Sequence, residues 1–412
     1  MPGDKSISHR ALILGALATG RTRVRGLAPG DDCWATRSCL GALGVSIGRF
    51  GAVHELDVEI DGLGLGGLRA PGGVLDARNS GTTARLLMGV LAGHPFRVTL
   101  TGDASLLRRP MRRVADPLTL MGARITTTDG CLPATVEGGH LQAISYTTPL
   151  PSAQVKTAVL LAGLHASGTT TIIEPAPTRD HTERALAAFG VPVAIDSAGI
   201  HVTGGAPLQA ADVAVPGDLS AAAFWAAAAA ALPGSAVEIP DVGLNPTRTA
   251  FLDVLRRVGA HVVADVTGPR SSEPVGTLTI RHAGVGPVVI APDEVPGLVD
   301  ELPVLAALAT HGGALTVTGA RELRLKESDR IAALAAGLRQ LGADVEEFSD
   351  GFAVNGARPL SGGVADAAGD HRLAMAFAIA ALGARDCSII RGAEVVSVSY
   401  PGFFEALEGL CE

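Results

Sequence analysis

The sequence predicts an α/β protein of two domains, and three observations support this prediction. The chain has 412 residues, whereas one domain usually holds about 100–200. Apolar residues make up 47% of the chain and charged residues 18%, which is typical of a protein with a large buried core. A pattern of helix, glycine and β-branched strand recurs six times. Six copies in two domains give three copies per domain.

The first repeated pattern is an Ala- and Leu-rich helical run, a glycine, a β-branched strand and a second glycine. Its copies cover residues 10–26, 84–102, 156–173, 222–239, 303–319 and 372–392. Glycine commonly ends a helix in the left-handed conformation. We therefore expect helix stops at Gly20, Gly93, Gly168, Gly234, Gly313 and Gly383.

A second helical pattern alternates with the first and ends in glycine followed by Ala or Val and a strand. We expect helix stops of the same kind at Gly44, Gly122, Gly190, Gly259 and Gly342. A sixth helix of this type covers residues 403–410. Each unit thus reads strand, helix, strand, helix, strand, and the β-branched runs predict parallel pairing within a unit. The composition changes near residues 213–218, so the first domain should span 4–217 and the second 218–412.

Composition argues against several classes of protein. The net charge of −8 is unlike that of a nucleic-acid binder, so we expect no nucleic-acid partner. The apolar run 219–232 is too short to cross a bilayer, and the polar N-terminus is unlike a signal peptide. Five scattered cysteines form no metal-ligand spacing and fit a reducing, cytoplasmic location. There is no P-loop and no HExxH motif, so we expect no metal.

The segment that leads into the first helix of each unit is polar, although the helix body is apolar. Each segment holds a Ser, Asn, Asp or Gly suited to capping. Helix starts also expose N–H groups and the positive end of the dipole, which bind anions. Ordinary helix capping explains any one of these segments. Several of them also carry a cation although the chain as a whole is acidic, and this coincidence favours anion-binding sites. Those cations are Lys5, Arg10, Arg78, Arg85, Lys156 and Arg372.

Two further segments are dense in charge. All but three of the 33 basic residues are arginine, and the lysines are Lys5, Lys156 and Lys326. The segment 106–113 places four arginines around Pro110, and a solvated basic face is its alternative explanation. In 321–330, Lys326 and Arg330 are four residues apart and share a helical face. A surface salt-bridge ladder is the alternative there.

Nine motifs, in order along the chain, resemble the EPSP synthase family. They are PGDKSISHR (2–10), RNSGTTAR (78–85), RRP (108–110), PSAQVK (151–156), TRDHTE (178–183), NPTRT (245–249), VDELPVLA (299–306), RLKESDR (324–330) and DHRLAMA (370–376). The resemblance implies a two-domain enolpyruvyl-transferase fold, with three βαβαββ units per domain and helix N-termini facing the interdomain cleft. It also implies that residues 1–3 belong with the second domain.

The same resemblance implies transfer of an enolpyruvyl group from phosphoenolpyruvate to the 5-hydroxyl of shikimate 3-phosphate, with release of phosphate. It implies no cofactor, and we expect a monomer. The family's acid–base pair maps onto Asp300 and Glu327. Its phosphoshikimate site maps onto Lys5, Ser6, Arg10, Ser152, Ala153, Gln154, Thr178, Asp300 and Lys326. Its phosphoenolpyruvate site maps onto Lys5, Gly81, Arg109, Gln154, Arg330 and Arg372.

These roles have a physical basis. Each substrate carries a phosphate and a carboxylate, so we expect a strongly cationic empty cleft. Arginine suits bidentate contacts with such anions, and Gly81 would let the backbone approach phosphoenolpyruvate closely. In the expected mechanism Glu327 protonates the methylene carbon, while Asp300, helped by Lys5, takes the hydroxyl proton.

The chain departs from the family pattern at three places. It begins at PGDKS, without the short strand that usually precedes this motif; Arg78 replaces a common glycine; and Val398 replaces a lysine that contacts phosphoenolpyruvate in some members. Because Gly81 leaves room in the pocket, we expect glyphosate to compete with phosphoenolpyruvate.

Two alternatives remain open. One is an enolpyruvyl transferase for UDP-N-acetylglucosamine, but such enzymes typically have a cysteine in the loop aligned with residues 105–111, and none is present. The other is a non-catalytic repeat protein that binds phosphorylated metabolites. The presence of Asp300 and Glu327 beside the anion-binding set argues against it.

Overall fold

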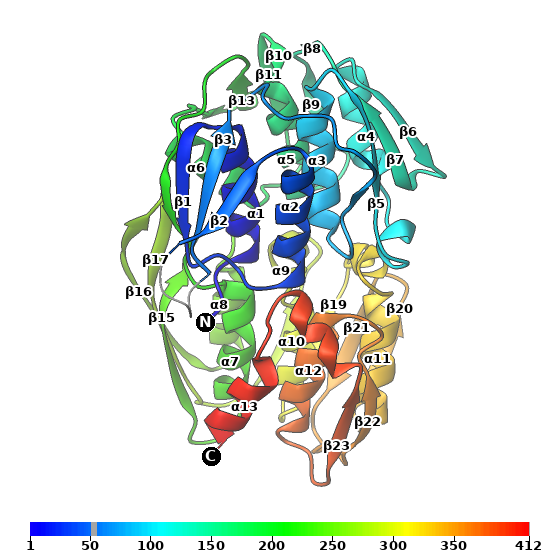
Figure 1. Cartoon of the computed structure of the whole chain (residues 1–412). Helices are drawn as coiled ribbons and strands as arrows, with labels where there is room; N and C mark the ends of the chain where they lie inside the picture. Colours follow the sequence, from blue (N-terminus) through cyan, green and yellow to red (C-terminus); the bar gives the residue numbers. More distant parts are fainter. Residues whose placement is uncertain (51–55, 412) are drawn as a thin grey trace. The chain divides into compact units, whose positions relative to one another are not determined.

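The computed structural model describes residues 1–50 and 56–411, and the chain forms two compact units (Figure 1). The N-terminal unit comprises Gly3–Val215 and Arg270–Glu273. The C-terminal unit comprises Met1–Pro2, Pro216–Pro269 and Pro274–Glu412. The short segment Arg270–Glu273 is the tip of a hairpin from the C-terminal half, and nothing in the sequence pattern predicts its grouping with the N-terminal unit.

The N-terminal unit holds six α-helices among its described residues. They are α1 (Lys5–Leu17), α2 (Asp31–Ala42), α3 (Gly81–Ala92), α4 (Arg112–Leu120), α5 (Ala153–Gly163) and α6 (His181–Ala188), with the short 3-10 helix η1 (Leu106–Arg108). The strands are β1 (Thr19–Arg25), β2 (Ser46–Arg49), β3 (Val58–Leu63), β4 (Leu75–Asp76), β5 (Arg97–Thr101), β6 (Arg124–Thr128), β7 (Cys131–Glu137), β8 (Leu141–Gln142), β9 (Ser145–Thr147), β10 (Ala166–Ser167), β11 (Thr169–Ile173), β12 (Ala194–Asp196), β13 (Gly199–Thr203) and β14 (Asp212–Ala214).

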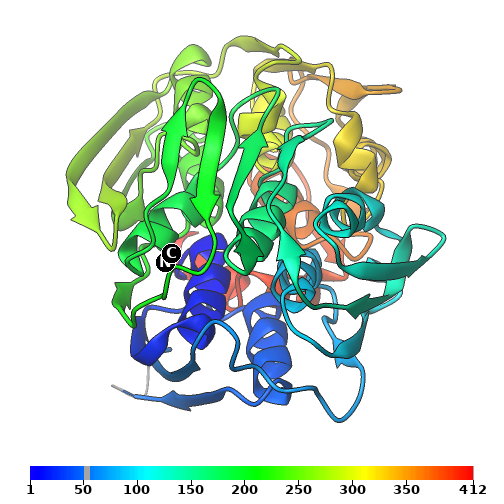
Figure 2. The same cartoon turned by 90° about the horizontal axis from the view of Figure 1, so that it is seen from above.

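Three four-stranded sheets cover the helices of this unit. Their strand orders are β14-β1-β3-β2, β4-β5-β7-β6 and β12-β13-β11-β9, and β10 pairs with β8. Helix α1 packs on α2, α2 on α3 and α3 on α5. The two blue helices α1 and α2 lie side by side in both views (Figures 1 and 2).

The C-terminal unit repeats this plan. Its helices are α7 (Leu219–Ala231), α8 (Ala250–Arg257), α9 (Val295–Leu298), α10 (Leu302–Ala309), α11 (Arg330–Gln340), α12 (His371–Ala381) and α13 (Phe403–Cys411), with 3-10 helices η2 (Arg321–Leu325) and η3 (Ala393–Val398). Its strands are β15 (Ala236–Gly243), β16 (His261–Arg270), β17 (Glu273–Arg281), β18 (Pro287–Ile290), β19 (Ala314–Val317), β20 (Asp344–Phe348), β21 (Gly351–Asn355), β22 (Gly363–Asp366) and β23 (Ser388–Arg391). The sheets are β15-β17-β16, β18-β19-β21-β20 and β22-β23.

The α/β class is confirmed, but the expectation that strands pair in parallel within each of the six sequence repeats is only partly right. Strands that flank a first helix are parallel, as in β4–β5, β18–β19 and β22–β23. The strand after the second helix instead turns back in a hairpin, so β6–β7 and β20–β21 are antiparallel. The first sheet takes its parallel strand from β14, which lies almost at the end of the unit.

The helix-stop glycines divide into two groups. All five glycines of the second pattern have left-handed φ, between 81° at Gly190 and 113° at Gly122, as predicted. The first pattern is less regular. Helix α3 ends at Gly93, its C-cap, and α12 ends just before Gly383, but neither glycine is left-handed, and Gly93 has φ −86°. Gly313 is not left-handed either. Gly20 and Gly168 are left-handed, with φ 103° and 101°, but they lie within or beside strands and not at a helix end. The prediction of a left-handed helix stop was therefore wrong at these five positions.

Each unit has its own hydrophobic core. Helix α7 shows why so many alanines are needed: twelve of its residues are buried, from Leu219 to Ala231. A helix that is apolar on every face must be packed on every face, and alanine allows neighbouring helices to approach closely. Helices α10 and α12 pack on α7 and on one another. No helix in the described part of the chain is long and apolar enough to span a membrane.

Candidate active site

The first helix of each of the six sequence repeats is α1, α3, α5, α7, α10 or α12, and five of these six helices have a side-chain N-cap. Asp4, Ser80, Ser152, Asp218 and Asp370 each accept a hydrogen bond from a backbone N–H of the first turn. The prediction that these segments cap helices is confirmed for these five. Helix α10 differs, because Glu301 occupies its N-cap position without a side-chain cap bond. The carboxylate of the preceding residue, Asp300, is left for other contacts.

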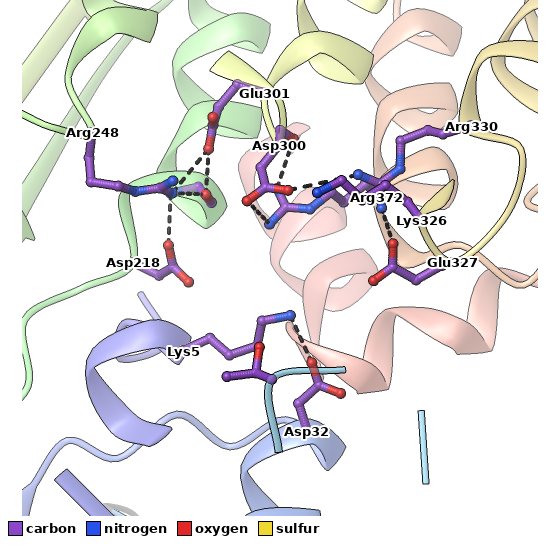
Figure 3. Close-up of polar contacts among 12 residues, drawn as sticks. Lys5, Asp32, Asp218, Arg248, Asp300, Glu301, Lys326, Glu327, Arg330 and Arg372 are labelled. Carbon is purple, nitrogen blue, oxygen red and sulfur yellow. Dashed lines mark hydrogen bonds and ion pairs between the residues drawn. The ribbon is translucent and has the colours of Figure 1, made fainter. Parts of the chain in front are cut away.

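The start of α1 carries Lys5. Its Nζ lies 2.8 Å from Oδ2 of Asp32, which is in the first turn of α2. The side chain of Lys5 is 18% exposed and that of Asp32 is 9% exposed, so the pair is largely shielded from solvent. Figure 3 shows this pair. Lys5 is therefore held by an acid that the sequence analysis did not connect with it.

Arg10, one turn later in α1, is buried and hydrogen-bonded to neutral oxygens. Its Nε donates to Thr182 Oγ1 at 2.7 Å, Nη2 to Thr157 Oγ1 at 2.8 Å, and Nη1 to the Ser6 carbonyl at 2.8 Å. Burial lowers the pKa of Arg10 to about 10, against the opposing effect of nearby Glu183. Arg10 remains protonated at neutral pH and joins helices α1, α5 and α6.

Thr178 lies in the loop before α6 and is fixed by a buried ion cluster. Its hydroxyl donates to Glu174, and its carbonyl accepts from Lys156 Nζ at 3.4 Å. Lys156 is only 1% exposed and pairs with Glu174 at 2.9 Å and Glu183 at 2.8 Å. Lys156 is thus occupied by two carboxylates, which makes it a support for Thr178 rather than a cation open to substrate.

The start of α3 brings two guanidinium groups to Gly81. A Cβ atom at this position would lie 2.8 Å from Nη1 of Arg85 and 3.4 Å from Nη1 of Arg109. Arg109 donates to the carbonyl of Asn79 at 3.2 Å and to its side-chain oxygen at 2.8 Å. A Cβ atom at position 81 would therefore force the guanidinium group of Arg85 to shift, and glycine leaves both guanidinium groups room beside the backbone.

The start of α5 is joined to α3 through Gln154. Its Oε1 accepts from Arg85 Nη1 at 2.6 Å, and its Nε2 donates to Thr82 Oγ1 at 2.9 Å. Ser152 and Ala153 lie beside it at the N-cap and first position of the helix. The structure therefore brings the predicted residues Gly81, Arg109 and Gln154 together through Arg85. Arg85 was recognisable in the sequence as a cation but was not among the predicted site residues.

In the C-terminal unit, two arginines meet the carboxylate of Asp300. Arg330 Nη1 lies 3.8 Å from Oδ1, and Arg372 Nη2 lies 3.7 Å from Oδ2. Arg372 also donates to the backbone carbonyl of Asp300 at 2.8 Å. Figure 3 shows both guanidinium groups directed at this carboxylate. The starts of α10, α11 and α12 are joined at this point.

Glu327 also contacts Arg330, through Nη2. Asp300 and Glu327 are the proposed acid–base pair, and one guanidinium group thus touches both. Lys326 lies next in sequence and pairs with Glu322 at 3.4 Å, with its side chain 23% exposed.

Asp370 was missed by the sequence analysis. It is fully buried, and its Oδ2 accepts from Arg330 Nε at 2.8 Å and from Ser328 Oγ at 3.2 Å. Burial alone would lower the pKa of Arg330, but Asp370, Glu327 and Asp300 outweigh burial, and the pKa is raised. Arg330 is therefore permanently charged. Asp370 lies in the motif DHRLAMA, but only the tertiary structure identifies it as the partner of Arg330.

The prediction of a strongly cationic empty site needs correction. In the C-terminal unit, Asp300, Glu327 and Asp370 surround Arg330 and Arg372. In the N-terminal unit Asp32 pairs with Lys5. A buried guanidinium without a counter-ion would cost several kcal/mol, and carboxylates accompany Lys5, Arg330 and Arg372, whereas Arg10 is hydrogen-bonded to neutral oxygens. Substrate anions would exchange with these carboxylates rather than fill an uncompensated positive site.

A second buried ion pair adjoins Asp300 in sequence. Glu301 is 2% exposed and accepts from Arg248 Nη2 at 3.1 Å, and the hydroxyl of Ser220 contacts both. Arg248 comes from the NPTRT motif, to which the sequence analysis gave no role. The cluster joins the starts of α7 and α10 and so fixes the backbone that carries Asp300.

The structure explains the unusual Arg78. Its φ of 51° is left-handed, which is the conformation that glycine adopts without strain. The N–H of Arg78 donates to Asp76 Oδ1 at 2.7 Å, which stabilises the turn. Val398 ends η3 and is half-buried. No group of three or more potential metal-ligating side chains occurs among the described residues.

Comparisons with known proteins agree along the whole chain. The family model for EPSP synthase (3-phosphoshikimate 1-carboxyvinyltransferase) matches residues 1–407. The 3-phosphoshikimate 1-carboxyvinyltransferase of Shouchella clausii is 49% identical over 413 residues, covering 100% of this chain and 95% of that protein. The corresponding protein of Bacillus licheniformis is 46% identical, covering 100% and 96%. A solved structure of EPSP synthase from Acinetobacter baumannii has a TM-score of 0.86 and 42% identity, covering 99% of this chain and 94% of that one. The chain belongs to the EPSP synthase family.

Proposed function

We propose that the chain transfers the enolpyruvyl group of phosphoenolpyruvate to the 5-hydroxyl of shikimate 3-phosphate and releases phosphate. This is a step of the shikimate pathway, which leads to aromatic amino acids. The observation that carries the proposal is the contact of Asp300 and Glu327 with the same guanidinium group of Arg330. That contact holds two carboxylates, one for each proton transfer, beside a group that binds anions.

Shikimate 3-phosphate is assigned to the starts of α1 and α5 and to two residues of the C-terminal unit. Lys5 and Arg10 supply positive charge, and the start of α5, which Ser152 caps, supplies first-turn N–H groups that can bind an anion. Thr178 is held by the Lys156 cluster. The full set comprises Lys5, Ser6, Arg10, Ser152, Ala153, Gln154, Thr178, Asp300 and Lys326.

Phosphoenolpyruvate is assigned to a set that includes the start of α3. Gly81 lies against the guanidinium groups of Arg85 and Arg109, which supports an anion site at that turn. Arginine forms paired hydrogen bonds with phosphate and carboxylate groups. The full set comprises Lys5, Gly81, Arg109, Gln154, Arg330 and Arg372.

In the proposed mechanism Glu327 donates a proton to the methylene carbon of phosphoenolpyruvate. The 5-hydroxyl oxygen attacks C2, and Asp300, helped by Lys5, takes the hydroxyl proton. The resulting tetrahedral intermediate still carries phosphate. Glu327 then removes a methyl proton, the C2–O bond to phosphate breaks, and phosphate leaves with the proton held by Asp300. No step needs a cofactor, because every step is a proton transfer or an addition or elimination at C2.

Arg330 connects binding with this chemistry. A substrate anion that takes the place of Glu327 on Arg330 removes this ion pair from the glutamate, and a carboxylate that loses an ion pair protonates more readily. Substrate binding thus prepares Glu327 to act as an acid. A monomeric enzyme in the cytoplasm is part of the same proposal.

Phosphate release tests the proposal. The purified chain is incubated with phosphoenolpyruvate and either shikimate 3-phosphate or UDP-N-acetylglucosamine, and free phosphate is measured over time. We expect release with shikimate 3-phosphate only. Release with the nucleotide sugar alone would identify the other transferase activity. Tight binding of both substrates without release would identify a non-catalytic binding protein.

A further inference from the structure

A chain of buried hydrogen bonds connects His9 of α1 with the start of α3. His9 Nδ1 lies 2.7 Å from Thr36 Oγ1 in α2, and Thr36 Oγ1 lies 2.7 Å from Thr83 Oγ1 in α3. Thr83 Oγ1 lies 2.8 Å from Oγ of Ser80. All four side chains are fully buried. The three helices pack consecutively, α1 on α2 and α2 on α3 (Figure 1).

The direction of these hydrogen bonds follows from the far side of the imidazole. Among the described residues, Nε2 of His9 is buried and has no hydrogen-bond partner. A buried N–H without an acceptor costs more than a bare nitrogen lone pair, so the proton belongs on Nδ1. Nδ1–H then donates to Thr36, and the hydroxyl of Thr36 donates to Thr83.

The hydroxyl of Thr83 extends the series of hydrogen bonds in the same direction, toward Ser80. The hydroxyl of Thr83 has two acceptors in reach, Ser80 Oγ at 2.8 Å and the carbonyl of Asp32 at 3.3 Å. Ser80 Oγ also accepts from the N–H of Thr83 at 3.1 Å, which is the cap bond of α3. The cap residue therefore receives two hydrogen bonds from Thr83, and the orientation of Thr83 depends on the donor at Thr36.

We propose that His9, as the neutral Nδ1–H tautomer, positions the first turn of α3 through Thr36 and Thr83 and thereby places Gly81 for phosphoenolpyruvate. The part that concerns phosphoenolpyruvate rests on the proposed function. His9 is a positioning residue, because it reaches Gly81 only through three other side chains. Neither the capping motif nor the spacing of these residues predicts the chain, since His9 and Thr36 are 27 residues apart and Thr36 and Thr83 are 47 apart.

The charge state of His9 supports this role. Burial, and next the positive charges of Lys5 and Arg10, lower the pKa of His9 well below its ordinary value near 6.5. The imidazole is therefore neutral when the enzyme works. A neutral imidazole that is buried on all sides serves to orient its neighbours and not to carry protons to solvent.

Thr36→Val tests the chain with a substitution of almost unchanged shape. Val removes both the acceptor for His9 and the donor to Thr83. Thr170→Val is the matched control: Thr170 is equally buried in the same unit, and its hydroxyl has no hydrogen-bond partner among the described residues. Thr36→Ser keeps the hydroxyl and should restore wild-type behaviour.

Two measurements compare these variants. Loss of the hydrogen bond from Thr36 to Thr83 should raise the amide exchange rates of Thr83 and Ala84, and the KM for phosphoenolpyruvate, by about three- to tenfold in Thr36→Val. The KM for shikimate 3-phosphate should stay within about twofold, which a general loss of stability would not produce. Thr170→Val and Thr36→Ser should match the wild type. Equal exchange rates at Thr83 and Ala84 in Thr36→Val and Thr170→Val would overturn the proposal.

The tautomer of His9 gives a test that does not depend on activity. Nitrogen NMR of the ¹⁵N-labelled wild-type protein should show a protonated Nδ1 and a bare Nε2 at neutral pH, and a protonated Nε2 would overturn the assignment. The exchange and NMR results stand even if the wild type releases no phosphate with shikimate 3-phosphate. Failure of the proposed function is therefore distinguishable from failure of the hydrogen-bond chain.

Discussion

Arg330 and Asp370 form a buried ion pair that joins the first turns of α11 and α12. Nε of Arg330 donates to Oδ2 at 2.8 Å and Nη2 to Oδ1 at 3.3 Å, and the two side chains are 1% and 0% exposed. The same carboxylate accepts the N–H of Arg372 at 3.0 Å. Asp370 therefore fixes both arginines that meet at Asp300. The proposed binding groups of the C-terminal unit are thus arranged by a residue that was not selected from the sequence.

Asp370→Asn should both destabilise the protein and weaken phosphoenolpyruvate binding. Removing one charge from a buried pair typically costs about 3–5 kcal/mol, and the remaining contacts of Arg330 with Glu327 and Asp300 favour the lower end. Denaturant unfolding and the KM for phosphoenolpyruvate measure the two effects. Asp344→Asn, at an exposed position, should change the unfolding free energy by less than about 0.5 kcal/mol. Equal effects of the two variants would contradict the structural role of Asp370.

Gly81→Ala should raise the KM for phosphoenolpyruvate. The added Cβ would meet Arg85 Nη1 at 2.8 Å, so this guanidinium must move from its hydrogen bond with Gln154. Loss of a charged hydrogen bond costs about 1.5–3 kcal/mol, which corresponds to roughly ten- to a hundredfold in KM. Steady-state kinetics with each substrate in turn measures this change.

Gly41→Ala is the control for that variant. Gly41 lies near the end of α2, is exposed, and has open space where a Cβ would be. Alanine should stabilise the helix by about 0.5–1 kcal/mol and leave both KM values unchanged. If Gly81→Ala behaves like Gly41→Ala, then the start of α3 does not hold phosphoenolpyruvate.

Glu327→Gln should bind both substrates but lose turnover. Glutamine keeps the shape of the side chain and cannot exchange a proton with carbon. General acid–base groups contribute about 10²–10⁴-fold, so kcat should fall by at least about a hundredfold. Single-turnover phosphate release measures the chemical step. Glu347→Gln, which breaks an exposed pair with Arg324, should retain wild-type kcat. A kcat for Glu327→Gln within about tenfold of wild type would show that Glu327 is not the acid.

His165 should make the protein sensitive to acid. Burial, and next His94, lower the pKa of His165 from 6.5 to about 3. The unfolded chain therefore binds this proton more tightly than the folded chain does. The stability that neutral His165 contributes is complete above pH 6.5 and is lost as the pH falls from 6.5 toward 3. The loss is about 1.4 kcal/mol per pH unit over this range.

His165→Phe should reduce that sensitivity. Phenylalanine keeps an aromatic ring against His94, whose ring centroid is 5.0 Å away, and cannot bind a proton. Unfolding free energies at pH 8, 6.5 and 4.5 measure the slope. Below pH 6.5 the variant should lose about 1.4 kcal/mol less per pH unit than the wild type. An unchanged slope would mean that His165 is not responsible.

The sequence predicted local features of the fold well. Five glycines with left-handed φ and five side-chain caps lie where the helical patterns placed them. Such features depend on a few neighbouring residues, and their signals are local in the sequence. The error at Gly313 is also local: the adjacent residue Gly312, with φ 102°, adopts the left-handed conformation instead. The sequence pattern cannot tell which of two adjacent glycines adopts this conformation.

The compensation of charge in the site was not predictable from the sequence. Arg330 and Asp370 are 40 residues apart, and Arg10 and Thr182 are 172 apart. Such partners are chosen by the packing of helix starts within each unit, which the sequence pattern does not encode. The motifs identified the residues that meet, but not which carboxylate holds each cation. For the same reason the sequence suggested a strongly cationic site, whereas the structure pairs Lys5, Arg330 and Arg372 with carboxylates.

The proposed function requires residues of both units to hold the same pair of substrates. A crystal structure with shikimate 3-phosphate and phosphoenolpyruvate bound tests this claim most directly. We expect Arg109 of the N-terminal unit and Arg330 and Arg372 of the C-terminal unit to lie within about 3 Å of phosphoenolpyruvate oxygens. Phosphoenolpyruvate held by residues of one unit alone, with Glu327 distant from its methylene carbon, would contradict the account.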